Sequence, residues 1–154
     1  MLGTASLIAR HPKTNKIYCI SLMGGGTCTF VLQAGVPAKP RQATMLRQVL
    51  LNLVDNATKY NQPGGRVEIA LIRDRNQLQL TVANTGPGIA PELLPRVFER
   101  FVRGNTQPSP GNESCGLGLT ICKWIVEAHG GHLEIQSIPG KLTTVSVRLP
   151  IDSR

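Results

Sequence analysis

The amino-acid sequence predicts an α/β fold of the α+β two-layer sandwich type, in which helices cover one face of a mixed, mainly antiparallel sheet. Three observations support this prediction. The chain has 154 residues, the size of one domain, and 41% of them are apolar, which is enough for a core without added cross-links. The expected strands occur in neighbouring pairs, which favours antiparallel pairing. Two expected helices can then cover one face of the sheet.

The first predicted elements are a short strand at residues 30–33 and a helix at residues 43–59. Residues 1–29 show little pattern, so no element is expected there. The helix has one apolar face, because apolar residues recur at helical spacing: Leu46, Val49, Leu50, Leu53 and Ala57. The polar and glycine-rich segment at residues 61–65 ends the helix.

Four further features are expected along the chain. They are a hairpin of strands at residues 67–72 and 77–82, a short helix at 91–101, a longer helix at 117–129, and a second pair of strands at 132–137 and 143–149. The hairpin is predicted by strand-forming residues on both sides of a short turn. Pro91 is suited to the first turn of a helix. Gly130 and Gly131 are typical of a helix end.

The net charge of +8 is unevenly distributed, because all nine acidic residues follow Val54. One interpretation of this basic, acid-free stretch is a surface for polyphosphate or nucleic acid. The other is a segment that is not ordinary domain sequence, which we favour because no aromatic residues alternate with the basic ones. We therefore divide the chain into an atypical basic segment, residues 1–40, and a domain, residues 41–154. No nucleic acid partner is expected.

Composition argues against several other classes of protein. Neither a zinc site nor a disulfide framework is expected, because no C-x-x-C pair occurs among Cys19, Cys28, Cys115 and Cys122. The sequence has no run of 18 apolar residues and no signal-peptide pattern at its start. We therefore expect a cytoplasmic domain that makes no membrane contact itself, including the case of the cytosolic part of a membrane-anchored receptor.

A polar stripe on the helix at residues 43–59 is the first candidate site. Asn52, Asn56 and Lys59 are spaced i, i+4 and i+7, so their side chains lie in one narrow stripe beside the apolar face. Amide oxygens are hard ligands suited to Mg²⁺, and an ammonium group suits a phosphate chain. An ordinary solvated face would have the same spacing.

Two glycine-rich turns are the other candidates. Asn84-Thr85-Gly86-Pro87-Gly88-Ile89 follows an expected strand, and its glycines allow the backbone to approach a ligand closely. The Asn84 amide can hydrogen-bond the edge of a base. Gly116-Leu117-Gly118-Leu119 opens an expected helix, where free N–H groups bind phosphate oxygens. Either segment alone could be an ordinary turn.

Taken together and in order, these segments resemble the sensor histidine kinases over about residues 45–150. The matching segments are QVLLNLVDNATKYN (48–61) for the N box, VANTGPGI (82–89) for the G1 box, VFERF (97–101) for the F box, CGLGLTICKWIVEAHGG (115–131) for the G2 box and its helix, and TTVSVRLP (143–150) for the last strand. The resemblance implies the ATP-binding Bergerat fold. It also implies a catalytic domain that transfers the γ-phosphoryl group of Mg-ATP to a histidine.

Roles for individual residues follow from the resemblance. Asn56 would bind Mg²⁺, while Asn52 and Lys59 would act at the phosphates. Tyr60 would stack on adenine. The base pocket would be formed by residues of the G1 box, namely Asn84, Gly86, Gly88 and Ile89.

The resemblance also implies how the phosphates and partners are held. The start of the G2 box would hold the phosphates through Gly116, Leu117, Gly118 and Leu119, beside an ATP lid at residues 102–115. Arg100 or Arg103 would reach the γ-phosphate or the acceptor domain. The implied partners are a dimerisation domain that carries the acceptor histidine and a downstream response regulator.

Two departures from the family pattern affect the expected activity. The family's usual G1 aspartate is Asn84 here, so we expect weakened ATP binding and some tolerance of guanine. The only histidines are His11, His129 and His132, and none lies on a dimerising helix, so the acceptor would come from an upstream region or another chain.

Hydrolysis is expected to be slow, and two alternative functions remain open. Asn52 occupies the position where hydrolysing relatives carry glutamate, and an amide cannot take a proton from water. One alternative is a stand-alone protein serine kinase of the anti-sigma-factor type. The other is a nucleotide-binding pseudokinase.

Overall fold

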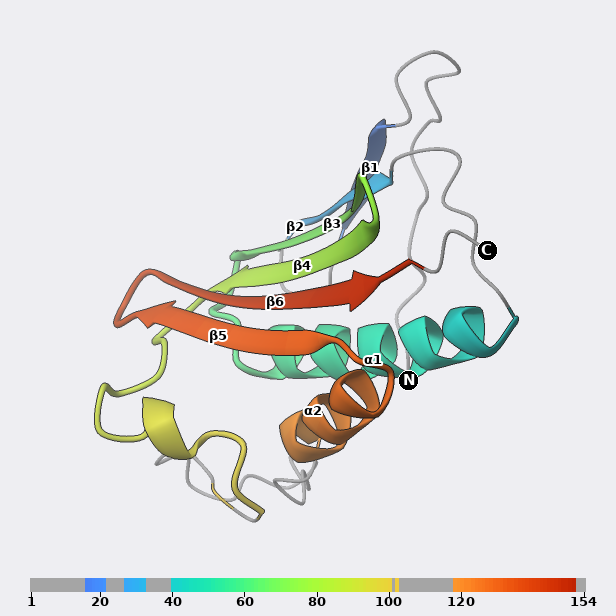
Figure 1. Ribbon diagram of the computed structural model, residues 1–154. Helices are drawn as coiled ribbons and strands as arrows, with labels where there is room; N and C mark the ends of the chain where they lie inside the picture. Colours follow the sequence, from blue (N-terminus) through green and yellow to red (C-terminus); the bar gives the residue numbers. More distant parts are fainter. Residues whose placement is uncertain (1–15, 22–26, 33–39, 101, 103–117, 152–154) are drawn as a thin grey trace.

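One sheet of six strands organises the computed structural model, which describes residues 16–21, 27–32, 40–100, 102 and 118–151 (Figure 1). The strands are β1 (Lys16–Ser21), β2 (Thr27–Leu32), β3 (Arg66–Asp74), β4 (Gln77–Thr85), β5 (His132–Ile138) and β6 (Leu142–Pro150). Their order across the sheet is β1-β2-β3-β4-β6-β5. Among these strands β2 and β3 pair in parallel and the other neighbours are antiparallel. The predicted mixed, mainly antiparallel sheet is therefore confirmed.

Both long helices, α1 (Pro40–Lys59) and α2 (Gly118–Ala128), lie on the same side of the sheet (Figure 1). The core lies between these two layers, and its fully buried members are Val49, Leu53, Val67, Ile69, Leu78, Val82, Cys122, Val126 and Val147. The predicted two-layer sandwich is thus confirmed. No helix in the described part of the chain is long and apolar enough to cross a membrane.

The register of the central strands determines which residues meet at the edge of the core. Asn84 lies opposite Val67 of β3 on one side and Thr143 of β6 on the other. Thr85, one residue further along, lies opposite Leu142. The end of β4 is therefore enclosed by strands on both sides, while the loop that follows it is free to approach α1.

Two expectations need correction. β1 was not predicted, and β2 begins three residues before the strand expected at residues 30–33. Although both strands lie within residues 1–40, they belong to the same sheet as the rest, because β1 pairs with β2 and β2 pairs with β3. The boundary between residues 40 and 41 stays a prediction. β1 was missed because its residues, KIYCIS, do not alternate between polar and apolar.

The helix predicted at residues 91–101 is the second correction. The described part of this segment contains only one short 3₁₀ turn, η1 (Leu94–Arg96), flanked by turns. Its backbone hydrogen bonds are mostly of the i to i+3 type, as from the Arg96 N–H to the Leu93 carbonyl at 2.9 Å. Pro95 lacks an N–H to donate, and its ring disfavours an α conformation for Leu94. This explains why an α-helix does not extend through the segment.

Candidate functional site

A cleft of about 540 Å³ lies among the C-terminal half of α1, the loop after β4, the start of α2 and the end of the β5–β6 hairpin. Its described lining is mostly apolar and contains four polar side chains, those of Asn56, Tyr60, Asn84 and Thr143. No charged residue occurs in the lining among the residues that the structure describes. A cleft of this volume with few polar groups is typical of a site for a small molecule.

Helix α1 forms one wall of the cleft. Helical spacing brings Leu53, Asn56, Ala57 and Tyr60 to the same side, and all four line the cleft. Leu53 and Ala57 also belong to the buried core. The polar Asn56 and Tyr60 are therefore held at the rim of the core, where the sequence places the polar stripe.

The other two members of the predicted stripe do not line the cleft. The Lys59 ammonium lies 2.8 Å from the Asp55 carboxylate, one helical turn earlier. The Asn52 side chain hydrogen-bonds the thiol of Cys122, which is buried on α2. Burial raises the pKa of this thiol to about 11, and the bond with Asn52 opposes that rise. The phosphate contacts assigned to Asn52 and Lys59 stay predictions.

Asn84 is a buried polar residue, only 7% exposed, and lines the cleft from the end of β4. Its side-chain Nδ2 donates a hydrogen bond of 2.9 Å to the Thr85 carbonyl oxygen. This bond sets the orientation of the amide, because the flipped amide would bring two acceptor oxygens together. We therefore expect Oδ1, on the other side of the amide, to accept a hydrogen bond from a ligand.

The loop after β4 approaches its neighbours so closely that two positions require glycine. A Cβ on Gly86, whose φ is 146°, would meet the Tyr60 carbonyl oxygen. A Cβ on Gly88, whose φ is 75°, would lie 2.9 Å from Ser137 Oγ. Gly88 and Ile89 line the cleft, whereas Gly86 packs behind Tyr60. Both glycines therefore shape the wall, one directly and one from behind.

The end of the β5–β6 hairpin supports the far side of this loop. The Ile89 N–H donates to Ser137 Oγ at 2.8 Å, and the Gly140 N–H donates to the Pro87 carbonyl at 2.8 Å. The Ser137 and Thr143 hydroxyls lie 2.9 Å apart and share a hydrogen bond. Ser137 and Thr143 were not predicted as site residues, because no local motif shows that this hairpin reaches the loop after β4.

The first turn of α2 completes the described cleft. A Cβ on Gly118 would lie 3.7 Å from both Oδ1 and Nδ2 of Asn56, so this glycine keeps the space in front of the amide open. Leu119 lines the cleft. The Thr120 hydroxyl donates to the Phe98 carbonyl at 2.8 Å, which ties α2 to the segment before the predicted lid.

The predicted site residues thus fall into three groups. The structure brings Asn56, Tyr60, Asn84, Gly88, Ile89 and Leu119 together around one cleft, with Gly86 and Gly118 directly beside them. Asn52, Lys59 and the exposed Arg100 do not line the cleft. Arg103, Gly116 and Leu117, together with the predicted lid beyond Val102, lie outside the described residues.

Comparison with known proteins identifies the family of the chain. Residues 41–153 match the family described as histidine kinase-, DNA gyrase B-, and HSP90-like ATPase. Sensor protein SrrB of Staphylococcus aureus is 47% identical over 105 residues, which is 67% of this chain and 18% of SrrB. The mycobacterial sensor histidine kinase MprB is 32% identical with a TM-score of 0.62, over 80% of this chain and 83% of that one. Full-length ShkA, solved in complex with AMPPNP, is 28% identical with a TM-score of 0.68, over 82% of this chain and 26% of that one.

The chain belongs to the histidine kinase-, DNA gyrase B- and HSP90-like ATPase family. Within this family it is an ATP-binding catalytic domain of the sensor histidine kinase type, as predicted from the order of the boxes. The comparisons do not favour the serine kinase or pseudokinase alternatives. The chain spans less than a fifth of the length of SrrB.

Proposed function

We propose that this domain binds Mg²⁺-ATP in the cleft and transfers the γ-phosphoryl group to a histidine on a dimerisation domain, from which a response regulator receives it. The observation that carries the proposal is the meeting of Asn56 and Asn84 in one largely apolar cleft that closely approaching glycines border. The relative ShkA was solved with AMPPNP, which supports a nucleotide as the occupant. Because the reaction consumes ATP, we place the domain in the cytoplasm.

The lining supports adenine at the inner end of the cleft. Val82, Val145 and Ile135 offer an apolar surface for a flat base, and Tyr60 adds an aromatic ring. Asn84 offers its Oδ1 to the exocyclic amino group. The phosphates would then extend toward Gly118, where a Cβ would narrow the space in front of Asn56.

The residues around Asn56 are compatible with Mg²⁺, which prefers oxygen ligands and usually keeps several waters. Within the described residues, no group of three or more His, Cys, Asp or Glu side chains could hold a metal by itself. Asn56 would therefore share the ion with the phosphates and water. When bound, Mg²⁺ would neutralise charge that develops on the phosphates during transfer.

The lining favours transfer to imidazole over hydrolysis. Among the described residues no carboxylate lines the cleft, so none is placed to take a proton from water. A neutral imidazole nitrogen needs no such base. It would attack the γ-phosphorus, so that an N–P bond forms as the bond to the β-phosphate oxygen breaks. ADP leaves, and the imidazole proton passes to solvent.

Calorimetric titration with AMPPNP tests the binding step. We expect saturable binding that requires Mg²⁺, with a dissociation constant in the range of about 1 μM to 1 mM. Asn56→Ala should remove most of the dependence on Mg²⁺. Asn76→Ala, which changes an exposed amide in the β3–β4 turn, is the matched control and should bind as the wild type does.

A transfer assay tests the acceptor. The domain is mixed with ATP labelled in the γ-phosphate and with a dimerisation domain that carries a histidine. We expect label on that domain in an acid-labile form, because phosphohistidine is unstable in acid. Acid-stable label would instead indicate a serine acceptor, and absence of nucleotide binding by the wild type would rule out the proposal altogether.

A further inference from the structure

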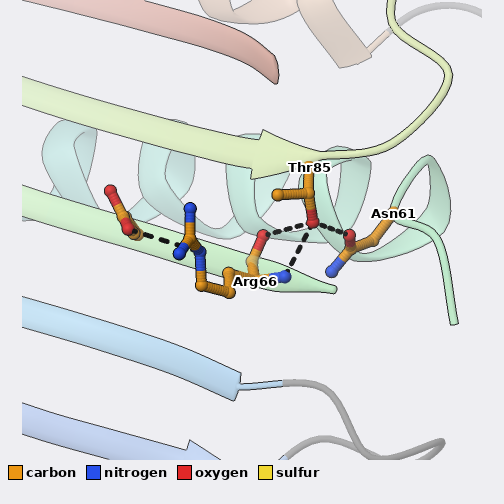
Figure 2. Close-up of polar contacts among 4 residues, drawn as sticks. Asn61, Arg66 and Thr85 are labelled. Atoms are coloured by element: carbon orange, nitrogen blue, oxygen red, sulfur yellow. Dashed lines mark hydrogen bonds and ion pairs between the residues drawn. The ribbon is translucent and has the colours of Figure 1, made fainter. Parts of the chain in front are cut away.

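A polar network lies next to the cleft-lining residues Tyr60 and Asn84, where the segment after α1 meets the end of β4 (Figure 2). The Thr85 hydroxyl donates to Asn61 Oδ1 at 2.7 Å and accepts the Arg66 N–H at 2.7 Å. Asn61 Oδ1 also accepts the Gln62 N–H at 2.9 Å. None of these residues lines the cleft. Direct contact with a ligand in the cleft therefore does not explain why these residues form a network.

The network connects two residues, each of which directly follows a cleft-lining residue in the sequence. Asn61 comes directly after Tyr60, and Thr85 comes directly after Asn84. The backbone carbonyl oxygen of Thr85 also accepts a hydrogen bond of 2.9 Å from the side-chain amide of Asn84. A single threonine thus holds the orientation of Asn84 with its backbone and the position of the Tyr60 segment with its hydroxyl.

Two glycines show how closely the neighbouring segments are packed. A Cβ on Gly65 would meet both Asn61 Oδ1 and Thr85 Oγ1, so glycine at this position leaves the space in which the hydrogen bond forms. A Cβ on Gly86 would meet the Tyr60 carbonyl oxygen. The Arg66 side chain takes no part, because it points to Glu68 in an exposed ion pair of 3.7 Å (Figure 2).

We infer that Thr85, through its hydrogen bond to Asn61, is a positioning residue that sets the spacing between Tyr60 and Asn84 and so determines nucleotide affinity. This inference rests on the proposed function. A displacement of either segment would change the width of the part of the cleft assigned to adenine. A preorganised wall avoids the entropic cost of ordering both segments when the ligand binds.

Thr85→Val tests the inference, because valine keeps the shape of threonine and removes the hydroxyl. We expect AMPPNP to bind about fivefold more weakly, the size of one net hydrogen bond. Thr85→Ser restores the hydroxyl and should bind within about twofold of the wild type. Thr81→Val is the matched control, because Thr81 lies on the same strand and face, is also half-buried and does not line the cleft.

Two further measurements separate positioning from loss of folding. The Arg66 N–H should exchange with solvent faster in Thr85→Val, with or without nucleotide, because its acceptor is gone. Gly65→Ala should weaken AMPPNP binding as Thr85→Val does, because the added methyl group occupies the place of the hydrogen bond. If Thr85→Val does not fold, Gly65→Ala and Asn61→Ala give the same test from the partner side.

The outcomes are distinct. Weak binding by Thr85→Val with rescue by Thr85→Ser supports the inference. Equal binding by Thr85→Val and the wild type overturns it, and so does equal weakening by Thr85→Ser or Thr81→Val, since the hydroxyl of Thr85 would then not be the cause. Failure of the wild type to bind AMPPNP appears before any variant is compared, and overturns the inference together with the proposed function.

Discussion

We expect Asn84 to determine which base the cleft accepts. The sequence alone leads to an expectation of some guanine tolerance, because an amide can offer either its donor or its acceptor. In the structure Asn84 Nδ2 donates a hydrogen bond to the Thr85 carbonyl oxygen. A flip of the Asn84 amide would lose this bond and place Oδ1 against that carbonyl oxygen. Guanine presents an oxygen where adenine presents an amino group, and that oxygen would face Oδ1.

We therefore expect AMPPNP to bind about 5- to 150-fold more tightly than GMPPNP, since an unpaired buried acceptor costs about 1–3 kcal/mol. Competition calorimetry with the two analogues measures this ratio. The same ratio in Thr81→Val serves as the control. Equal affinities for both analogues would show that the Asn84 amide turns freely.

Ser137 supports the wall of the cleft from the β5–β6 hairpin. Ser137→Ala removes the acceptor of the Ile89 N–H and the partner of the Thr143 hydroxyl. We expect AMPPNP affinity to fall about fivefold, as for one net hydrogen bond. Ser146→Ala on β6 is the control, because Ser146 is also half-buried but does not line the cleft. An unchanged affinity in Ser137→Ala would mean that the loop keeps its position without this bond.

At the scale of elements, the turn between α2 and β5 depends on the absence of a side chain at Gly131. A Cβ there would lie 2.5 Å from the Arg148 carbonyl oxygen and 2.9 Å from Val126 Cγ1. Backbone and core would both have to move, so we expect Gly131→Ala to lower the free energy of unfolding by about 1–3 kcal/mol. Gly140→Ala is the comparison, because its turn has open space around the added methyl group, although φ is 74°.

Urea denaturation of the two glycine variants measures this difference. Gly140→Ala carries only the backbone cost of a left-handed conformation, about 1 kcal/mol. A smaller loss of stability for Gly131→Ala than for Gly140→Ala would contradict the packing at the α2–β5 turn.

The elements also show what local patterns reveal. The helix at α1 was predicted within three residues of its start and at its observed end, because its apolar spacing and the glycines after it act locally. The strands of both hairpins were predicted for the same reason. β1 was missed because its residues do not alternate between polar and apolar, and the helix at residues 91–101 was overestimated because the effect of Pro95 was not read from periodicity.

At the scale of the whole molecule, the buried Cys122 thiol makes stability depend on alkaline pH. Its pKa is raised by burial from 9.0 to about 11, so the folded state keeps the thiol proton where the unfolded chain loses it. The stabilising contribution is complete below about pH 9 and is lost as the pH rises toward 11. A shift of this size corresponds to up to about 3 kcal/mol.

Urea unfolding of the wild type and Cys122→Ala from pH 7 to 11 tests this. Cys122→Ala should be less stable at neutral pH because of the cavity that it leaves. Its free energy of unfolding should nevertheless fall less steeply between pH 9 and 11. Identical slopes in the two proteins would show that the thiol does not cause the alkaline loss.

The sequence by itself determined the family, the two-layer fold and the candidate residues on the cleft, because each box is a short local pattern. It identified Asn56, Tyr60, Asn84 and Gly88, which the structure brings to one cleft. Only the tertiary structure decided that Ser137 supports the loop after β4 and that Thr85 of β4 bonds Asn61, just after the end of α1. These contacts join residues through side-chain orientation and chain reversal, and neither follows from the residue types along the sequence.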